Sequence, residues 1–229
     1  MDSMYEILMA LPLFSGVSYS KLSEVVGTTK FHFLKYLEGE KVVDAGQACT
    51  HIKFVISGSC RSVVTNPGGR MSVSQTLKAP NVIAPEFLFG RTPIYPCTVT
   101  ALEPTGIMQI AKTDYVKLLN CDPVFMFNYL NMLSVSAQKS LNGVLALTAG
   151  SLDERIAFWI VALTQRSGTD ITLSVRQRDL YSMFGVQRSS FMATLESMKQ
   201  RGLIDYSSNE IKIHDRNELV AMLTTHFGD

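Results

Sequence analysis

The chain has 229 residues, a hydrophobic fraction of 46% and a formal net charge of +1. Its length and hydrophobic fraction are sufficient for one or two globular domains with a buried core. No apolar run reaches the roughly 18 residues that a membrane-spanning helix needs, and the acidic residues 1–6 lack the features of a secretory signal. We therefore expect a cytoplasmic protein without a membrane partner, and the near-neutral charge gives no overall indication of nucleic-acid binding.

Residues 3–30 are predicted to form short helices, interrupted at Leu11–Phe14, with Ser18 or Ser20 as an N-cap. From Phe31 onward, short apolar segments alternate with turns that often contain Gly or Pro. The predicted strands cover residues 33–37, 41–43, 52–56, 59–64, 71–77, 98–102 and 106–111. Short strands at such regular spacing indicate a small antiparallel barrel or jelly roll.

After a short helix at Tyr115–Asn120, a long helix is predicted from Pro123 to about Ala149. Along it, apolar and small residues recur at spacings of three and four, as in the seam of a coiled coil. The residues of this seam are Leu130, Leu133, Ala137, Ser140 (or Leu141), Val144 and Leu147. A helix that packs on its own core would show the same stripe, but this helix is long for that role, so we favour a dimerisation helix.

Gly150-Ser151 interrupts the long helix, and a further helix is predicted at Leu152–Gln165. Ser151 is suited to its N-cap, and Asp153 and Glu154 place favourable negative charge in its first turn. We therefore expect a β-rich domain at residues 1–122, the long helix at 123–149 and a C-terminal domain at 150–229.

Residues 174–204 have the pattern of two short helices separated by a tight turn. Ser174 and Gln177 have the spacing of a capping box, and Gly185 suits the left-handed end of the first helix. The predicted apolar faces are Leu180, Met183 and Phe184 in the first helix, and Phe191, Leu195 and Met198 in the second. This pattern indicates a helix-turn-helix, which places its second helix in the major groove of DNA, although many helix pairs share it.

A strand, a polar turn and a second strand are predicted at residues 202–204, 205–210 and 211–213, as in the wing of a winged helix. Residues 176–203 carry five Lys or Arg against two Asp or Glu, whereas residues 150–229 balance at nine against ten. The positive charge that DNA binding requires is therefore only local. A last helix is predicted at Asn217–His226.

Four segments match the signatures of a known family in order and spacing: Leu13–Gly16, Glu38–Val43, Phe54–Arg61 and Leu152–Ala157. Through them the chain, from about residue 10 to 215, resembles the CRP/FNR superfamily of bacterial transcription regulators. The resemblance implies an α+β fold with an N-terminal antiparallel β-roll of the cyclic-nucleotide-binding type, a long dimerisation helix and a C-terminal winged helix-turn-helix. It also implies a homodimer joined along residues 124–149 that binds a two-fold symmetric site in double-stranded DNA.

The effector pocket implied by this resemblance departs from the cyclic-nucleotide pattern. Pro85-Glu86 stands where that pattern has Gly-Glu, and Tyr95-Pro96 stands where it has the Arg-Ser pair that binds the phosphate. Neither Tyr nor Pro replaces a charge-assisted Arg–phosphate contact, and Arg91 is a nearby substitute that stays open. We expect no cyclic AMP and no other cofactor, and either a more apolar effector or a pocket filled by side chains. The residues assigned to this pocket are Glu86, Phe87, Arg91, Tyr95, Pro96, Cys97 and Ser140.

The resemblance further implies that each subunit inserts Arg188–Thr194 into a major groove. Arg188 can donate to both acceptors of a guanine, whereas Ala193 stands where the cyclic-AMP-controlled member of the family has an arginine. The operator is therefore expected to differ. The residues assigned to DNA binding are Arg176, Gln177, Gln187, Arg188, Ser189, Ser190, Ala193 and Lys199.

The cysteines and histidines are scattered, without CxxC, HxH or HxxxH pairs: Cys49, Cys60, Cys97, Cys121, His32, His51, His214 and His226. Metal and cluster sites usually need closer spacing, so we expect no metal and reduced thiols, and leave a redox role of the cysteines open.

Three functions compete. The first is a non-enzymatic, homodimeric transcription regulator, which would also contact RNA polymerase if it activates transcription. The second is a ligand-binding module that controls a protein partner through its winged domain. The third, an enzyme, is disfavoured because the sequence shows no paired carboxylates, activated nucleophile or metal cluster.

Overall fold

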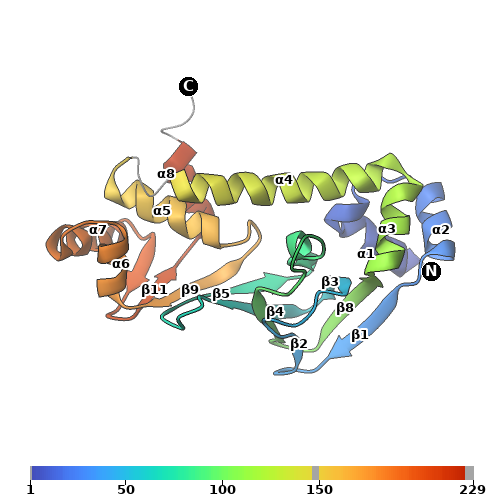
Figure 1. Ribbon diagram of the computed structural model, residues 1–229, viewed down its shortest axis with the longest axis horizontal. Coiled ribbons are helices and arrows are strands. Elements are labelled where there is room, and N and C mark those ends of the chain that lie inside the picture. The colour runs from blue at the N-terminus through green and yellow to red at the C-terminus, as the bar shows by residue number, and fades with distance from the viewer. Residues whose placement is uncertain (1, 146–149, 225–229) are drawn as a thin grey trace. The chain divides into compact units, whose positions relative to one another are not determined.

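The computed structural model describes residues 2–145 and 150–224, which fall into two compact units (Figure 1). The first unit consists of Met1–Ser62 and Leu77–Ser136, and the second of Val63–Thr76 and Ala137–Asp229. Each unit has its own hydrophobic core. The sequence places boundaries after residues 122 and 149, whereas the contacts group the segment 63–76 with the C-terminal residues.

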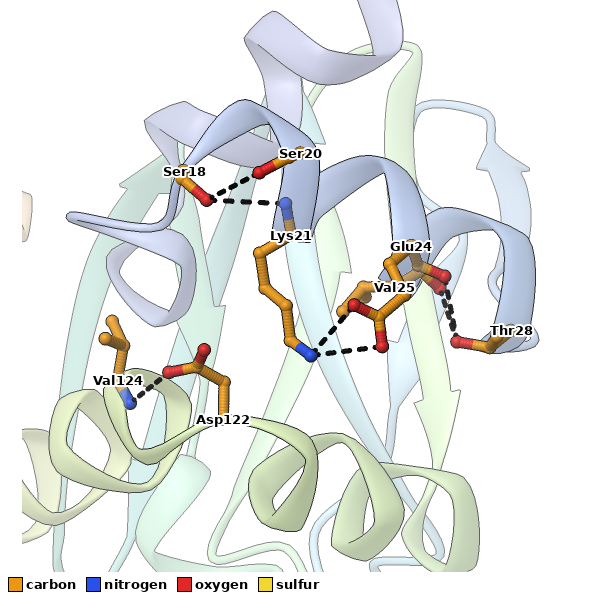
Figure 2. A network of polar contacts seen from close by, with 8 residues as sticks. All are labelled: Ser18, Ser20, Lys21, Glu24, Val25, Thr28, Asp122 and Val124. Carbon is orange, nitrogen blue, oxygen red and sulfur yellow. Dashed lines mark hydrogen bonds and ion pairs between the residues drawn. The ribbon is translucent and has the colours of Figure 1, made fainter.

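The first unit opens with the helices α1 (Asp2–Ala10), η1 (Pro12–Phe14, a 3-10 helix) and α2 (Tyr19–Thr28). Ser18 is the N-cap of α2, as predicted, and its hydroxyl accepts a hydrogen bond from the Lys21 backbone N–H (3.4 Å). One turn later Lys21 Nζ pairs with the Glu24 carboxylate at 3.0 Å, and the Thr28 hydroxyl donates to the Glu24 carbonyl oxygen at 2.9 Å (Figure 2). The side chains of α2 thus satisfy polar groups at both of its ends.

The strands of the β-roll follow: β1 (His32–Tyr36), β2 (Lys41–Val43), β3 (His51–Ser57), β4 (Ser59–Thr65), β5 (Met71–Lys78), β6 (Asn81–Ile83), β7 (Cys97–Ala101) and β8 (Thr105–Ala111). One antiparallel sheet has the order β1-β8-β3-β6, and in the remaining strands of this unit β4 lies beside β7 and β7 beside β2. The predicted strands are all present within one or two residues. Among the strands of the β-roll, β6 alone is not predicted, because this three-residue strand lies between two prolines and its sequence has the pattern of a loop.

Two helices complete this region: α3 (Lys112–Cys121) and α4 (Pro123–Leu145). Asp122 precedes α4, and its carboxylate accepts a hydrogen bond from the Val124 backbone N–H at 2.9 Å (Figure 2). Phe125 and Tyr129 bury their side chains in the core of the first unit. The predicted long helix is therefore present as far as Leu145, and its expected last turn lies outside the described residues.

The second unit contains α5 (Leu152–Leu163), β9 (Thr169–Val175), α6 (Gln177–Met183), α7 (Arg188–Gln200), β10 (Ile204–Tyr206), β11 (Glu210–Ile213) and α8 (Arg216–Thr224). Ser151 and Glu154 form a capping box at the start of α5, in which the Ser151 N–H donates to the Glu154 carboxylate at 2.7 Å. The wing strands lie two residues later (β10) and one residue earlier (β11) than predicted. The expected end of the last helix, at His226, lies outside the described residues.

Strand β9 was not predicted, although Ile171, Leu173 and Val175 alternate with polar residues and are buried. It pairs on one side with β11 and on the other with β5, whose Val73 lies opposite Leu173 (Figure 1). The tip of the β4–β5 hairpin is thereby part of the second unit.

Side chains of this hairpin enter the second core. Val73 is 4% exposed and belongs to the cluster formed by α5, α7 and β9. The buried Gln75 side chain accepts a hydrogen bond from the Gln165 backbone N–H at 2.7 Å. The Gln75 amide lies so close to Gly168 that a Cβ added there would displace the Gln75 side chain. The second unit therefore depends on residues that precede it by about a hundred positions in the chain.

Replacing Val73 by Ala should lower the free energy of unfolding of the second unit by about 2 kcal/mol, because two buried methyl groups are removed from a packed core. Denaturant unfolding followed by circular dichroism measures this loss. The matched control is Val64→Ala on the same hairpin, where the side chain is 37% exposed; its effect should stay below about 0.5 kcal/mol. Equal losses from both variants would contradict the assignment of Val73 to the second core.

Candidate nucleic-acid interface and sensor loop

Helices α6 and α7 form the predicted helix-turn-helix. Phe184 is the C-cap of α6, Gly185 adopts a left-handed φ of +66°, and Gln187 is the N-cap of α7 without a side-chain capping bond. The positive φ explains why glycine stands in the turn.

The capping box predicted at the start of α6 is wrong. Ser174 lies in β9, and Arg176 is the N-cap of α6, with no side-chain capping bond. The Gln177 side chain instead donates to the Ser207 carbonyl oxygen at 2.8 Å, which ties α6 to the turn of the wing. Strand pairing thus overrode a local capping signal.

Aromatic contacts fix the two helices on α5. The Phe184 ring stacks on Phe191 of α7, with ring centres 6.3 Å apart, and forms a T-shaped contact with Trp159 of α5, with ring centres 5.8 Å apart. Leu180, Leu195 and Met198 are buried as predicted, but Met183 is 42% exposed and does not belong to the apolar face.

The first turns of α7 present a polar, exposed face. Arg188, Ser189, Ser190 and Ala193 are all exposed, and the Thr194 hydroxyl donates back to the Ser190 carbonyl oxygen at 3.0 Å. Among the described residues, no ion pair or side-chain hydrogen bond involves Arg188. This end of α7 therefore carries a free guanidinium beside small hydroxyl groups.

Three of the five local cations are already paired within the unit. Arg176 contacts Asp179 at 3.0 Å, Lys199 contacts Asp205 at 3.4 Å, and Arg201 contacts Asp153 at 2.9 Å. Arg178 and Arg188 have no such partner in the ranges that the structure covers. The local net charge predicted from sequence thus overstates the charge available to a phosphate backbone.

The wing packs on the second half of α7. Glu196 accepts a hydrogen bond from the Tyr206 hydroxyl at 2.9 Å, and Lys199 Nζ lies 5.8 Å from the centre of the Tyr206 ring. His214 Nε2 contacts Asp205 at 3.0 Å, and this hydrogen bond holds the pKa of Asp205 below its ordinary value. Lys199, assigned to DNA from the sequence, therefore has a structural partner in β10.

The residues assigned to an effector pocket divide between core and surface. Tyr95 and Cys97 are buried, Phe87 and Pro96 are half-buried, and Glu86 and Arg91 are exposed, while Ser140 lies on the part of α4 that belongs to the second unit. The Tyr95 hydroxyl donates to the His51 carbonyl oxygen at 2.9 Å, and burial raises its pKa far above the ordinary value. Tyr95, which the sequence analysis places at the phosphate-binding arginine of the cyclic-nucleotide pattern, is thus a buried and hydrogen-bonded side chain.

An aromatic cluster that the sequence did not reveal anchors the loop after β6. Ala84 adopts a φ of 43° before Pro85, and the Pro85 carbonyl oxygen accepts a hydrogen bond from the Tyr129 hydroxyl of α4 at 3.0 Å. Phe89 meets Tyr129 at 5.9 Å, and Tyr129 meets Tyr115 of α3 edge-on at 5.4 Å. The loop that carries Glu86 is thus attached directly to the long helix.

Within residues 2–145 and 150–224, no three His, Cys, Asp or Glu side chains are placed to hold a metal ion. Cys49, Cys60 and Cys97 are buried and Cys121 is exposed, all as free thiols. Burial raises the pKa of the Cys60 thiol to about 11. None of the helices in the described ranges combines the length and apolar character needed to cross a bilayer.

Two family models match this chain: a cyclic nucleotide-binding domain over residues 33–122 and a Crp-like helix-turn-helix domain over residues 154–222. Among solved structures, the catabolite activator protein of Thermus thermophilus is 19% identical and covers 93% of this chain and 99% of its own, with a TM-score of 0.52. The sensor domain of DNR from Pseudomonas aeruginosa is 19% identical over 66% of this chain and 96% of its own, with a TM-score of 0.52. CLP, a c-di-GMP responsive global regulator of Xanthomonas campestris, is 15% identical over 86% of this chain and 100% of its own, with a TM-score of 0.50. No curated protein matches the chain at a significant level.

A β-roll of the cyclic-nucleotide-binding type followed by a Crp-like helix-turn-helix defines a DNA-binding transcription regulator and not an enzyme. The predicted α+β architecture is confirmed, and the likeness to the solved structures concerns the fold. The chain belongs to the CRP/FNR superfamily.

Proposed function

We propose that a homodimer of this protein binds a two-fold symmetric DNA site through the first turns of α7, with Arg188 as the principal base contact. The observation that carries the proposal is the free Arg188 guanidinium on an exposed helix end whose opposite face is buried. Such a guanidinium matches the two acceptors of guanine, and Ser189 and Ser190 can contact bases or phosphates. Since a bacterial chromosome lies in the cytoplasm, the protein would act there.

The proposed dimer rests on an exposed apolar stripe along α4. Its members follow one another at alternating spacings of three and four, as in a coiled-coil seam. The stripe consists of Phe127, Leu130, Ser134, Ala137, Leu141 and Val144, all of them exposed. Leu133, assigned to the seam from sequence, packs instead against the core of the first unit, and Leu147 lies outside the described residues. A stripe of this length exposed on one chain supports a helix–helix dimer.

We further propose that the sensor responds to no cyclic nucleotide monophosphate. Tyr95 is buried where the pattern requires an arginine, and Arg91 is exposed and so supplies no enclosed cation for a phosphate. A more apolar effector near the Phe89–Tyr115–Tyr129 cluster, or a sensor filled by its own side chains, fits these residues. Contact with RNA polymerase would follow if the protein activates transcription.

The alternative function is a winged domain that docks on a protein partner. Lys199 and Arg201 are already paired with carboxylates of the same unit, so little free positive charge remains for DNA phosphates. This observation favours the alternative. The exposed Arg188 and the family favour DNA. Binding to random DNA at increasing salt separates the two, because only DNA binding falls steeply with salt.

Selection from a random DNA library should yield a palindromic site, and Arg188→Ala should abolish the preference at its guanine, a loss of about 1–3 kcal/mol per contact. Fluorescence anisotropy with the selected site and a scrambled site measures this preference. The control is Arg166→Ala, an exposed arginine before β9, which should bind like the wild type. If Arg188→Ala retains the wild-type preference, α7 does not read the site as proposed.

Leu141→Asp should weaken dimerisation at least about a hundredfold, because a carboxylate from each subunit would enter an apolar seam. Analytical ultracentrifugation across a concentration series measures the dissociation constant. The control is Val116→Asp on α3, where an apolar side chain is also exposed (41%); it should leave the dissociation constant unchanged. A dimer that survives Leu141→Asp would place the interface elsewhere.

Isothermal titration of the purified protein with cyclic AMP and with cyclic GMP should show no binding at micromolar concentrations, because no enclosed arginine pairs with the phosphate. Tyr95→Arg serves as the comparison: gain of cyclic-nucleotide binding in this variant would show that the rest of the pocket is competent. Micromolar binding to the wild type would refute the proposal.

A further inference from the structure

Arg155 joins α5 to the turn between α6 and α7. One of its terminal guanidinium nitrogens donates to the Phe184 carbonyl oxygen at 2.7 Å, and the guanidinium carbon lies 5.6 Å from the centre of the Phe184 ring. Phe184 is the C-cap of α6, where the last carbonyl groups of the helix carry a partial negative charge. One cation therefore contacts both the carbonyl and the ring of the residue at which the chain turns toward α7.

The contact continues into α7. The Phe184 ring stacks on Phe191 at 6.3 Å with an interplanar angle of 25°, and Phe191 is fully buried. Phe191 lies in the first turn of α7, three residues after Arg188. A continuous set of contacts thus runs from the first turn of α5, through the turn, to the end of α7 that carries the free guanidinium.

The contacts of Arg155 satisfy the Phe184 carbonyl oxygen in the turn but leave one donor of the guanidinium without a partner among the described residues. Arg155 Nε is buried and has no hydrogen-bond partner within the described ranges. Arg216, a buried arginine that also joins two elements of this unit, donates through Nε to the Thr164 hydroxyl at 3.0 Å and through a terminal nitrogen to the Val161 carbonyl oxygen at 3.2 Å. A buried donor without an acceptor is unfavourable, and the guanidinium contacts that the structure describes for Arg155 are those with the Phe184 carbonyl oxygen and ring.

We propose that Arg155 is a positioning residue for DNA recognition, which fixes the turn and thereby the direction in which α7 presents Arg188. The proposal rests on the function of α7 proposed above. Arg155 is half-buried and bonded within the unit, so it acts through Phe184 and makes no contact with DNA.

A readout without DNA tests the positioning directly. The chain has one tryptophan, Trp159, which is 7% exposed and forms a T-shaped contact with the Phe184 ring, with ring centres 5.8 Å apart. Arg155→Met keeps an unbranched apolar side chain and removes the donors. Loosening of the turn should raise the acrylamide quenching constant of Trp159 about twofold, since the carbonyl loses a charge-assisted hydrogen bond.

The second readout is DNA binding by the full-length protein. Arg155→Met should lower affinity for the selected site about tenfold, with little change for scrambled DNA. The dependence on salt should stay as in the wild type, because no phosphate contact is lost. Arg155→Lys, which keeps a cation near the carbonyl, should recover part of the affinity.

Arg216→Met is the matched control, because it removes a buried arginine from the same unit away from the turn. It should lower stability without raising Trp159 quenching or changing the ratio of specific to scrambled affinity. If the two Met variants lose the same stability and also change Trp159 quenching and the affinity ratio equally, Arg155 has only a structural role and the proposal is overturned. A salt slope shallower by about one per subunit in Arg155→Met would also overturn it, since that indicates a direct phosphate contact.

If the wild type itself shows no sequence preference, the proposed role of α7 fails, and the quenching result alone decides whether Arg155 positions the turn.

Discussion

Three aromatic rings determine the geometry of the second unit. Trp159, Phe184 and Phe191 come from α5, the turn and α7, and they contact one another in succession inside the core. Aromatic pairs bury a large area and prefer defined relative orientations, so they restrict rotation as well as separation. The left-handed Gly185 lets the chain reverse between two of these rings. The orientation of the polar face of α7 is therefore determined by the aromatic contacts on the buried face of the same helix.

Charge is distributed in a way that favours selectivity over general attraction to DNA. The unit uses Arg176, Lys199 and Arg201 to hold its own elements together. A surface with few free cations releases few counterions and gains little from the phosphate backbone alone. Base contacts and the shape of the duplex must then supply most of the discrimination. This agrees with a chain whose net charge is only +1.

Local sequence signals predicted the local structure well. The β-roll strands, the Ser18 and Ser151 caps and the glycine turn follow from short-range chemistry and are confirmed. Strand β9 was missed because Ser174 and Gln177 also have the spacing of a helix cap. Its alternation of buried and polar residues was available in the sequence and was the stronger signal. The partner of β9 on the hairpin could not be predicted, since pairing over such a distance leaves no local pattern.

The same limit applies to the candidate site. Exposure of Arg188 follows from helical periodicity, whereas the pairing of Lys199 with Asp205 depends on how the wing folds back. Leu133 fits the heptad spacing as well as its neighbours do, and only the packing shows that it faces the first core. The link between Pro85 and Tyr129 joins residues whose relation is visible only in three dimensions.

The hairpin that covers β9 also constrains how a new chain can fold. Met71 and Val175 pair although they lie about a hundred residues apart, and closing so long a loop is entropically slow. During synthesis the hairpin emerges well before β9 exists, and its tip has no sheet to join. Until the two meet, the edges of both are open templates for strands of other chains. The pairing of β5 with β9 therefore closes one strand edge on each partner and so protects the nascent protein from self-association.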